Sequence, residues 1–251
     1  MVQRFQIIRR TAISLVLATV PAVEHIACKG GDDMAIVATQ SNAKQRAAEA
    51  MEKLPFEKAR SIVFAILAED LSEQTRFDIM QSFVDRYKGK ALEEIRKQVL
   101  LAGRSPEDFS QLRKTNLRRF RYMKTLAYGL ARFGEQGFET AVQLVRAGAG
   151  MRMPFSSEEY LLLHGIATTA TYMMFHNKLI DPAKAVERLH AEVEDGEVAL
   201  PEKGLFIQWA VRINPRVASE WQAAVADDPA LKRILELHRE NSVRDSVPSR
   251  R

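Results

Sequence analysis

The chain has 251 residues, of which 46% are hydrophobic and 27% are charged. This balance excludes a highly charged disordered protein, and the length suffices for one large or two modest domains. The net charge of +5 is a mild excess, so any electrostatic function must depend on where the charges lie. The single cysteine, Cys28, excludes an internal disulfide, and no Cys/His cluster has the spacing of zinc ligands.

Residues 1–33 differ in composition from the rest of the chain. Three arginines within residues 1–10 precede an uncharged apolar run over residues 11–23. This run is too short to span a bilayer, which requires about 20 apolar residues. A basic start, a short apolar run and small residues near Ala22 are typical of a secretory signal peptide. We therefore expect a leader segment over residues 1–33.

Three other interpretations of the leader stay open. The arginine-rich, acid-poor start also fits a mitochondrial presequence. Cys28 suggests a lipoprotein site, but His25 stands where such a site requires an aliphatic residue. The segment could also be an N-terminal extension, with translation starting at Met34. Removal of residues 1–22 would predict an exported or periplasmic protein, whereas a start at Met34 would predict a cytoplasmic one.

Apolar residues recur with helical spacing along most of the chain. Phe56, Ala59, Val63 and Ile66, for example, follow one another at steps of three, four and three residues. The pattern predicts helices over residues 56–66, 77–87, 92–102, 115–133, 138–147, 158–176, 182–194, 202–213, 215–226 and 229–240. No alternating strand pattern with hairpin turns appears. The sequence therefore predicts an all-α fold of about nine or ten helices, either an irregular antiparallel bundle or stacked helical hairpins.

Short signals mark where these helices begin and end. Four capping residues precede a proline, which suits the first position of a helix: Ser105, Asp181, Asn214 and Asp228. Three glycines stand where helices are expected to stop: Gly89, Gly103 and Gly134.

The clearest functional signal is a basic stretch that contains no acidic residue between Asp108 and Glu135. Its seven cations are Arg113, Lys114, Arg118, Arg119, Arg121, Lys124 and Arg132. If residues 115–133 form one helix, a single stripe joins Lys114, Arg118, Arg121, Thr125, Tyr128 and Arg132. Leu117, Phe120, Ala127 and Leu130 fall on another face and are expected to enter the core. A cationic stripe with an exposed aromatic ring suits contact with an acidic surface or with phosphates and bases.

Two structural explanations compete with a binding role for this stripe. The acidic segment over residues 187–202 could fold against it and neutralise it, or the stripe could be a plain solvated face. Like charges three or four residues apart cost a helix only about 0.2–0.5 kcal/mol per pair, so the stripe does not require a ligand. The binding hypothesis depends on the stripe having no carboxylate partner from its own chain.

The best internal break is Ala147-Gly148-Ala149-Gly150, which runs on toward Met153-Pro154. It predicts an N-terminal helical subdomain over residues 34–150 and a C-terminal one over residues 151–240, although a long loop within one domain would look the same. Residues 241–251 are polar and are expected to form a disordered tail.

The uncharged run over residues 160–177 predicts a buried central helix rather than a membrane span. His164 and His176, twelve residues apart, would not share a helix face, and the positions of His190 and His238 favour packing roles. The sequence shows no nucleophile elbow, phosphate-binding loop or paired-histidine metal motif. It predicts no cofactor and no metal site.

These patterns favour a non-enzymatic interaction protein, an adaptor or regulator. We expect it to dock an acidic partner through Lys114, Arg118, Arg121, Tyr128 and Arg132 of the basic helix. The alternative is a nucleic-acid-binding protein that uses the same stripe. A second alternative is an enzyme whose catalytic residues converge from distant helices.

Overall fold

The computed structural model describes residues 32–103, 109–150, 161–221, 225, 228–233 and 235–236. Within these residues the fold is all-α, as predicted, and the helices pack antiparallel. They are α2 (Asp32–Lys53), α3 (Phe56–Leu67), α4 (Glu73–Tyr87), α5 (Gly89–Ala102), α6 (Phe109–Thr115), α7 (Leu117–Ala131), α8 (Glu135–Gly150), α9 (Leu161–His176), α10 (Pro182–Glu194), α11 (Leu200–Ile213) and α12 (Val217–Glu220).

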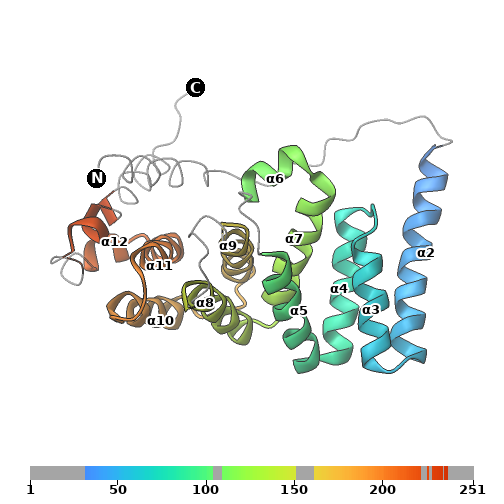
Figure 1. Cartoon of the computed structure of the whole chain (residues 1–251), viewed down its shortest axis with the longest axis horizontal. Coiled ribbons are helices and arrows are strands. Elements are labelled where there is room, and N and C mark those ends of the chain that lie inside the picture. Colours follow the sequence, from blue (N-terminus) through green and yellow to red (C-terminus); the bar gives the residue numbers. More distant parts are fainter. Residues whose placement is uncertain are drawn as a thin grey trace.

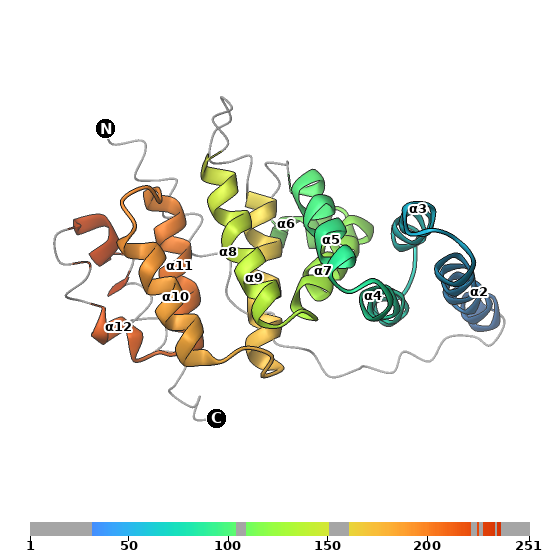
Figure 2. The same ribbon diagram turned by 90° about the horizontal axis from the view of Figure 1, so that it is seen from below.

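The helices stand side by side in one elongated array, with α2 at one end and α12 at the other (Figure 1). Seen after a quarter turn, α4, α5 and α7 follow α2 and α3, and the pairs α8/α9 and α10/α11 come next (Figure 2). This arrangement agrees with the predicted stack of helical hairpins. Nearly all of the predicted leader lies outside the described residues, and α2 begins at Asp32.

Helix α2 is missing from the sequence-based prediction. Its buried side is built mainly from alanine, because Ala43, Ala47 and Ala50 face the core together with Met51. Alanine favours the helix but is only weakly apolar, so the helix carries no strong hydrophobic periodicity. The helix is stabilised by packing against α3 and α4, which the sequence pattern did not indicate.

The proline signals are confirmed at two positions. The Asp181 carboxylate accepts hydrogen bonds from the backbone N–H groups of Ala183 and Lys184, and Pro182 occupies the first turn of α10. The Asp228 carboxylate likewise accepts from the backbone N–H groups of Ala230 and Leu231. Ser105 lies outside the described residues.

Two other boundary predictions are wrong. Gly89 begins α5 instead of ending α4, and the preceding Lys88 adopts the positive φ of 46° that the turn requires. Asn214 ends α11, and the short helix α12 begins only at Val217. Gly103 does cap α5, and Gly134, with φ of 54°, follows α7 as expected.

The predicted basic helix is two helices. Helix α6 ends at Thr115 and α7 begins at Leu117, with Asn116 between them in a non-helical conformation. The Asn116 side chain accepts a hydrogen bond from the backbone N–H of Arg119 and so caps α7. Lys114 therefore lies on α6 and Arg118 on α7, so the stripe predicted for one continuous helix is interrupted between these two residues.

Helices α7 and α9 lie at the centre of the core. Helix α7 packs against α4, α5 and α9, and α9 packs against α7 and α8. The buried apolar side chains on both sides of residue 150 form one cluster. Helix α8 continues through Ala147-Gly148-Ala149-Gly150, so the first half of the predicted break is helical. Residues 151–160, which hold its second half, lie outside the described residues.

The uncharged helix α9 is buried against its neighbours, as predicted. Ile166, Ala167, Ala170 and Met174 are completely buried. No helix in the described part of the chain combines the length and apolar character needed to cross a membrane.

The Trp209–Thr168 hydrogen bond joins α11 to α9 inside this core. The indole Nε1–H of Trp209 donates to Oγ1 of Thr168 at 2.8 Å, and both side chains are buried. Thr168→Val would leave the indole N–H without an acceptor, so we expect a loss of about 1–3 kcal/mol in the free energy of unfolding. Urea titration followed by far-UV circular dichroism measures it.

Thr168→Ser is the matched control, because it retains the hydroxyl acceptor and removes only a methyl group. We expect the serine variant to be the more stable of the two. A valine variant as stable as the wild type would show that this hydrogen bond contributes nothing.

Candidate functional site

The basic stripe divides into paired and unpaired cations. The Nε–H of Arg118 donates to the backbone oxygen of Ala68 at 2.6 Å. An Arg121 Nη1 lies 3.6 Å from Oδ1 of Asp70. Lys124 Nζ donates to Oε1 of Glu73 at 2.8 Å. Three successive turns of α7 therefore contact the α3–α4 connection and the first turn of α4.

These contacts correct two expectations. The stripe was expected to have no carboxylate partner from its own chain, but its Arg121 is paired with Asp70, and the neighbouring Lys124 of the basic stretch is paired with Glu73. The acidic segment 187–202 was the expected source of any internal partner, yet its carboxylates at Glu192 and Asp195 pair with Arg146 of α8. The sequence could not distinguish these acidic segments, because the pairing depends on which helix packs beside α7.

One ring face of Tyr128 is occupied within the chain. Its ring stacks on Phe77 of α4, with centroids 4.2 Å apart and ring planes 11° from parallel. Its O–H donates to Oε1 of Gln81 at 3.1 Å. Tyr128 thus links α7 to α4 and is partly buried, whereas the sequence suggested an exposed aromatic ring.

Lys114 and Arg132 are exposed at opposite ends of this region. Arg132 caps the C-terminal end of α7. At a rise of about 1.5 Å per residue, it lies about 21 Å along the helix from Arg118. The five predicted partner-binding residues therefore do not form one compact site.

A compact cationic surface does exist around the α6–α7 junction. Arg113 and Lys114 in the last turn of α6, and Arg118 in the first turn of α7, are exposed and form no ion pair within the part of the chain that the structure describes. Leu117 stands among them and is 46% exposed, although the sequence predicted that it would be buried. We call Arg113, Lys114, Leu117 and Arg118 the junction surface.

An exposed leucine among cations is a combination that favours protein contact. The cations attract an acidic segment over several ångströms, and the leucine offers apolar area that gains free energy when covered. The sequence placed Leu117 on the same face as Ala127 and Leu130, which are buried. As the first residue of α7, directly after the cap at Asn116, Leu117 remains at the surface.

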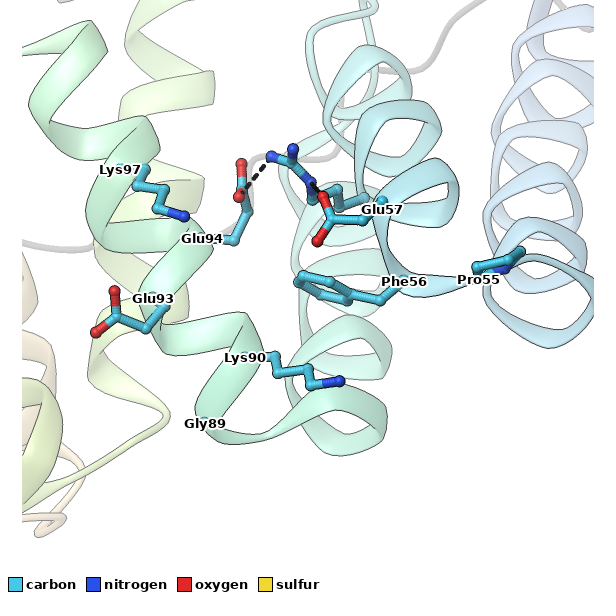
Figure 3. A pocket seen from close by; sticks show the side chains of 9 residues that line it. Pro55, Phe56, Glu57, Gly89, Lys90, Glu93, Glu94 and Lys97 are labelled. Carbon is cyan, nitrogen blue, oxygen red and sulfur yellow. Dashed lines mark hydrogen bonds and ion pairs between the residues drawn. The ribbon is translucent and has the colours of Figure 1, made fainter.

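The described residues also hold an open groove of about 490 Å³ between α3 and α5 (Figure 3). Arg60 crosses its wall and donates to Glu57 at 2.6 Å and to Glu94 at 2.7 Å. Lys90 approaches the ring of Phe56 at 5.8 Å. Because the buried Glu94 carboxylate is already neutralised by Arg60, we assign no ligand to this groove.

Two titratable groups in the core have pKa values shifted by burial. Burial lowers the pKa of His164 to about 4, so its imidazole is neutral near pH 7. Burial raises the pKa of Tyr172 to about 12. Among the described residues, no group of three or more His, Cys, Asp or Glu side chains could hold a metal ion.

Comparison with known proteins adds no assignment. No known protein family matches the sequence, and neither the curated proteins nor the solved structures show a significant similarity to it. Evidence about the function therefore comes from the contacts, burial and charge of the described residues.

Proposed function

We propose that the protein is a non-enzymatic interaction protein that docks an acidic protein partner on the junction surface. The observation that carries this proposal is the set of three exposed cations around Leu117, none of which forms an ion pair within the described residues. Arg121 continues the surface on α7, where its pair with the exposed Asp70 is loose at 3.6 Å. Exposed ion pairs contribute little, so a partner carboxylate can replace Asp70 at low cost.

The nucleic-acid alternative has less support from the geometry. Tyr128 was the aromatic residue expected to stack on a base, and one of its two ring faces is occupied by Phe77. Phosphate contacts by the cations alone would give binding without base stacking. Arg132 of the predicted stripe lies about 21 Å along α7 from Arg118, so the two arginines do not form one compact phosphate-binding surface.

The proposal is tested by binding of a fluorescent, glutamate-rich peptide to the full chain, measured by anisotropy at several salt concentrations. We expect binding that weakens as salt rises and falls at least about tenfold in Lys114→Glu/Arg118→Glu, because two attractions become repulsions.

The matched control is Lys58→Glu/Lys97→Glu, which changes the net charge equally at exposed positions on α3 and α5. It should keep affinity within about threefold, since exposed charges beyond a Debye length are largely screened. Equal losses in both double variants would overturn the proposal, because only net charge would then matter. Binding of a single-stranded oligonucleotide, with no binding of the peptide, would favour the nucleic-acid alternative instead.

A further inference from the structure

Arg76 is a fully buried cation in the first turn of α4, with 0% of its surface exposed. One Nη2–H donates to the backbone oxygen of Glu69. Its Nε and Nη1 nitrogens have no hydrogen-bond partner among the described residues. Buried arginine donors normally find acceptors, and leaving them without one costs free energy. Because these nitrogens are buried, Arg76 adds positive charge beneath the surface but offers no exposed donor to a ligand.

Two further arginines approach the same backbone segment from α7. Arg118 donates to the oxygen of Ala68, and Arg121 lies beside Asp70. Burial lowers the pKa of Arg76, and the positive charges of Arg121 and Arg118 lower it further, while Asp70 and Glu73 oppose them. Three arginines from two helices therefore meet consecutive residues of the α3–α4 connection, Ala68, Glu69 and Asp70.

Among the described residues, the acidic side chains of this segment compensate the cluster only in part. Glu73 is taken by Lys124, and Glu69 is taken by Arg46 at 3.0 Å. Asp70 is the remaining carboxylate, and its side chain is 79% exposed. Three positive charges against one negative charge leave an excess of two, and displacement of Asp70 leaves three, so the cluster favours a phosphoryl dianion. Arginine forks also fit the geometry of phosphate oxygens better than lysine does.

We propose that Arg76, Arg118 and Arg121 form a phosphoryl-binding site that anchors a phosphorylated segment of the acidic partner. This inference rests on the proposed function and names the chemistry of its anchor. Arg118 and Arg121 reach the phosphoryl oxygens from the surface, where the ligand displaces Asp70. Arg76 supplies positive charge from behind them. A phosphoserine carries about −1.5 to −2 charges at neutral pH and so replaces the single charge of Asp70 with a stronger one.

In the first experiment, inorganic phosphate is titrated into the full chain at pH 7.5 and constant ionic strength, and binding is measured by isothermal titration calorimetry. We expect binding that chloride does not reproduce, a loss of at least about tenfold in Arg121→Gln, and a gain of about threefold in Asp70→Asn. Lys97→Gln, an exposed position on α5 outside both surfaces, should leave phosphate affinity unchanged. Absence of phosphate binding, or equal binding in Arg121→Gln, would overturn the site.

The second experiment compares two glutamate-rich peptides that differ only by phosphorylation of one serine. We expect the phosphorylated peptide to bind at least about tenfold more tightly, and this ratio to fall toward one in Arg121→Gln. Lys114→Gln should weaken both peptides equally and preserve the ratio. Equal affinities for the two peptides would refute the phosphoryl anchor while leaving the junction surface intact. Phosphate binding without affinity for the unphosphorylated peptide would support the site and refute the acidic-partner proposal.

Discussion

Gly137→Ala is expected to lower the free energy of unfolding by about 3 kcal/mol, as overpacking at a rigid contact does. Gly137 lies in the first turn of α8, where a Cβ atom would stand 2.0 Å from the backbone oxygen of Leu130 in α7. Because the obstacle is backbone rather than a flexible side chain, α8 must move away from α7. Urea unfolding followed by circular dichroism measures the loss.

Gly89→Ala is the matched control for this substitution. Gly89 is the first residue of α5, and a Cβ there would meet no atom within 4 Å. Alanine favours helix over glycine by up to about 1 kcal/mol, so this variant should be as stable as the wild type or more stable. Equal stability of the two alanine variants would show that α8 does not approach α7 as closely as the structure indicates.

The second large effect is expected in the ion network between α8 and α10. Glu192 of α10 has a side chain that is 2% exposed and pairs with Arg146 at 3.1 Å and with Arg188. Replacing both arginines by methionine leaves this buried carboxylate without a cation. We expect a loss of about 3–5 kcal/mol, the usual cost of removing the partners of a buried charge. Chemical denaturation measures the loss.

The triple variant that also carries Glu192→Met serves as the control. A buried charge network replaced by apolar side chains of similar size is often neutral, so the triple variant should recover most of the lost stability. A triple variant no more stable than the double variant would contradict this explanation, since the loss would then come from packing rather than from an uncompensated charge.

The same network sets a pH dependence. Hydrogen bonds from Arg188 hold the pKa of the Glu139 carboxyl below its usual value of 4.5 in the folded state. A lowered folded-state pKa contributes stability above the pKa of the unfolded chain and loses it as the pH falls through the folded-state value. Stability should therefore decline below about pH 4.5, and less steeply in Arg188→Met. Equal slopes between pH 3 and 6 would contradict this assignment.

Much of the fold could be predicted from the sequence, because local signals and tertiary packing agree. Apolar residues at helical spacing indicated α3, α4, α5 and α10 to within a few residues, and Asp181 marked the start of α10 correctly. Helix α2 escaped notice because alanine forms its buried side.

The candidate site could be predicted only in part. A cap at Asn116 divides the basic region into two helices and separates Lys114 from the stripe, and Leu117, the first residue of α7, is exposed. Asn116 stands within an otherwise continuous helical pattern, and asparagine favours caps over helix interiors. This residue could therefore have indicated the break between the two helices. Nothing local indicated the buried Arg76, because its position follows from the packing of α4 against α7.

The order of residues alone determined that the chain is helical, that a region near residue 120 is rich in cations, and that an uncharged helix would be buried. These properties depend on neighbours within a few positions. Tertiary packing alone decided which acids meet those cations, because ion pairing requires atoms within about 4 Å whatever their separation along the chain. Packing placed Asp70 and Glu73 beside α7 and stacked the ring of Tyr128 on Phe77. The cations of the junction surface were left without an ion pair among the described residues.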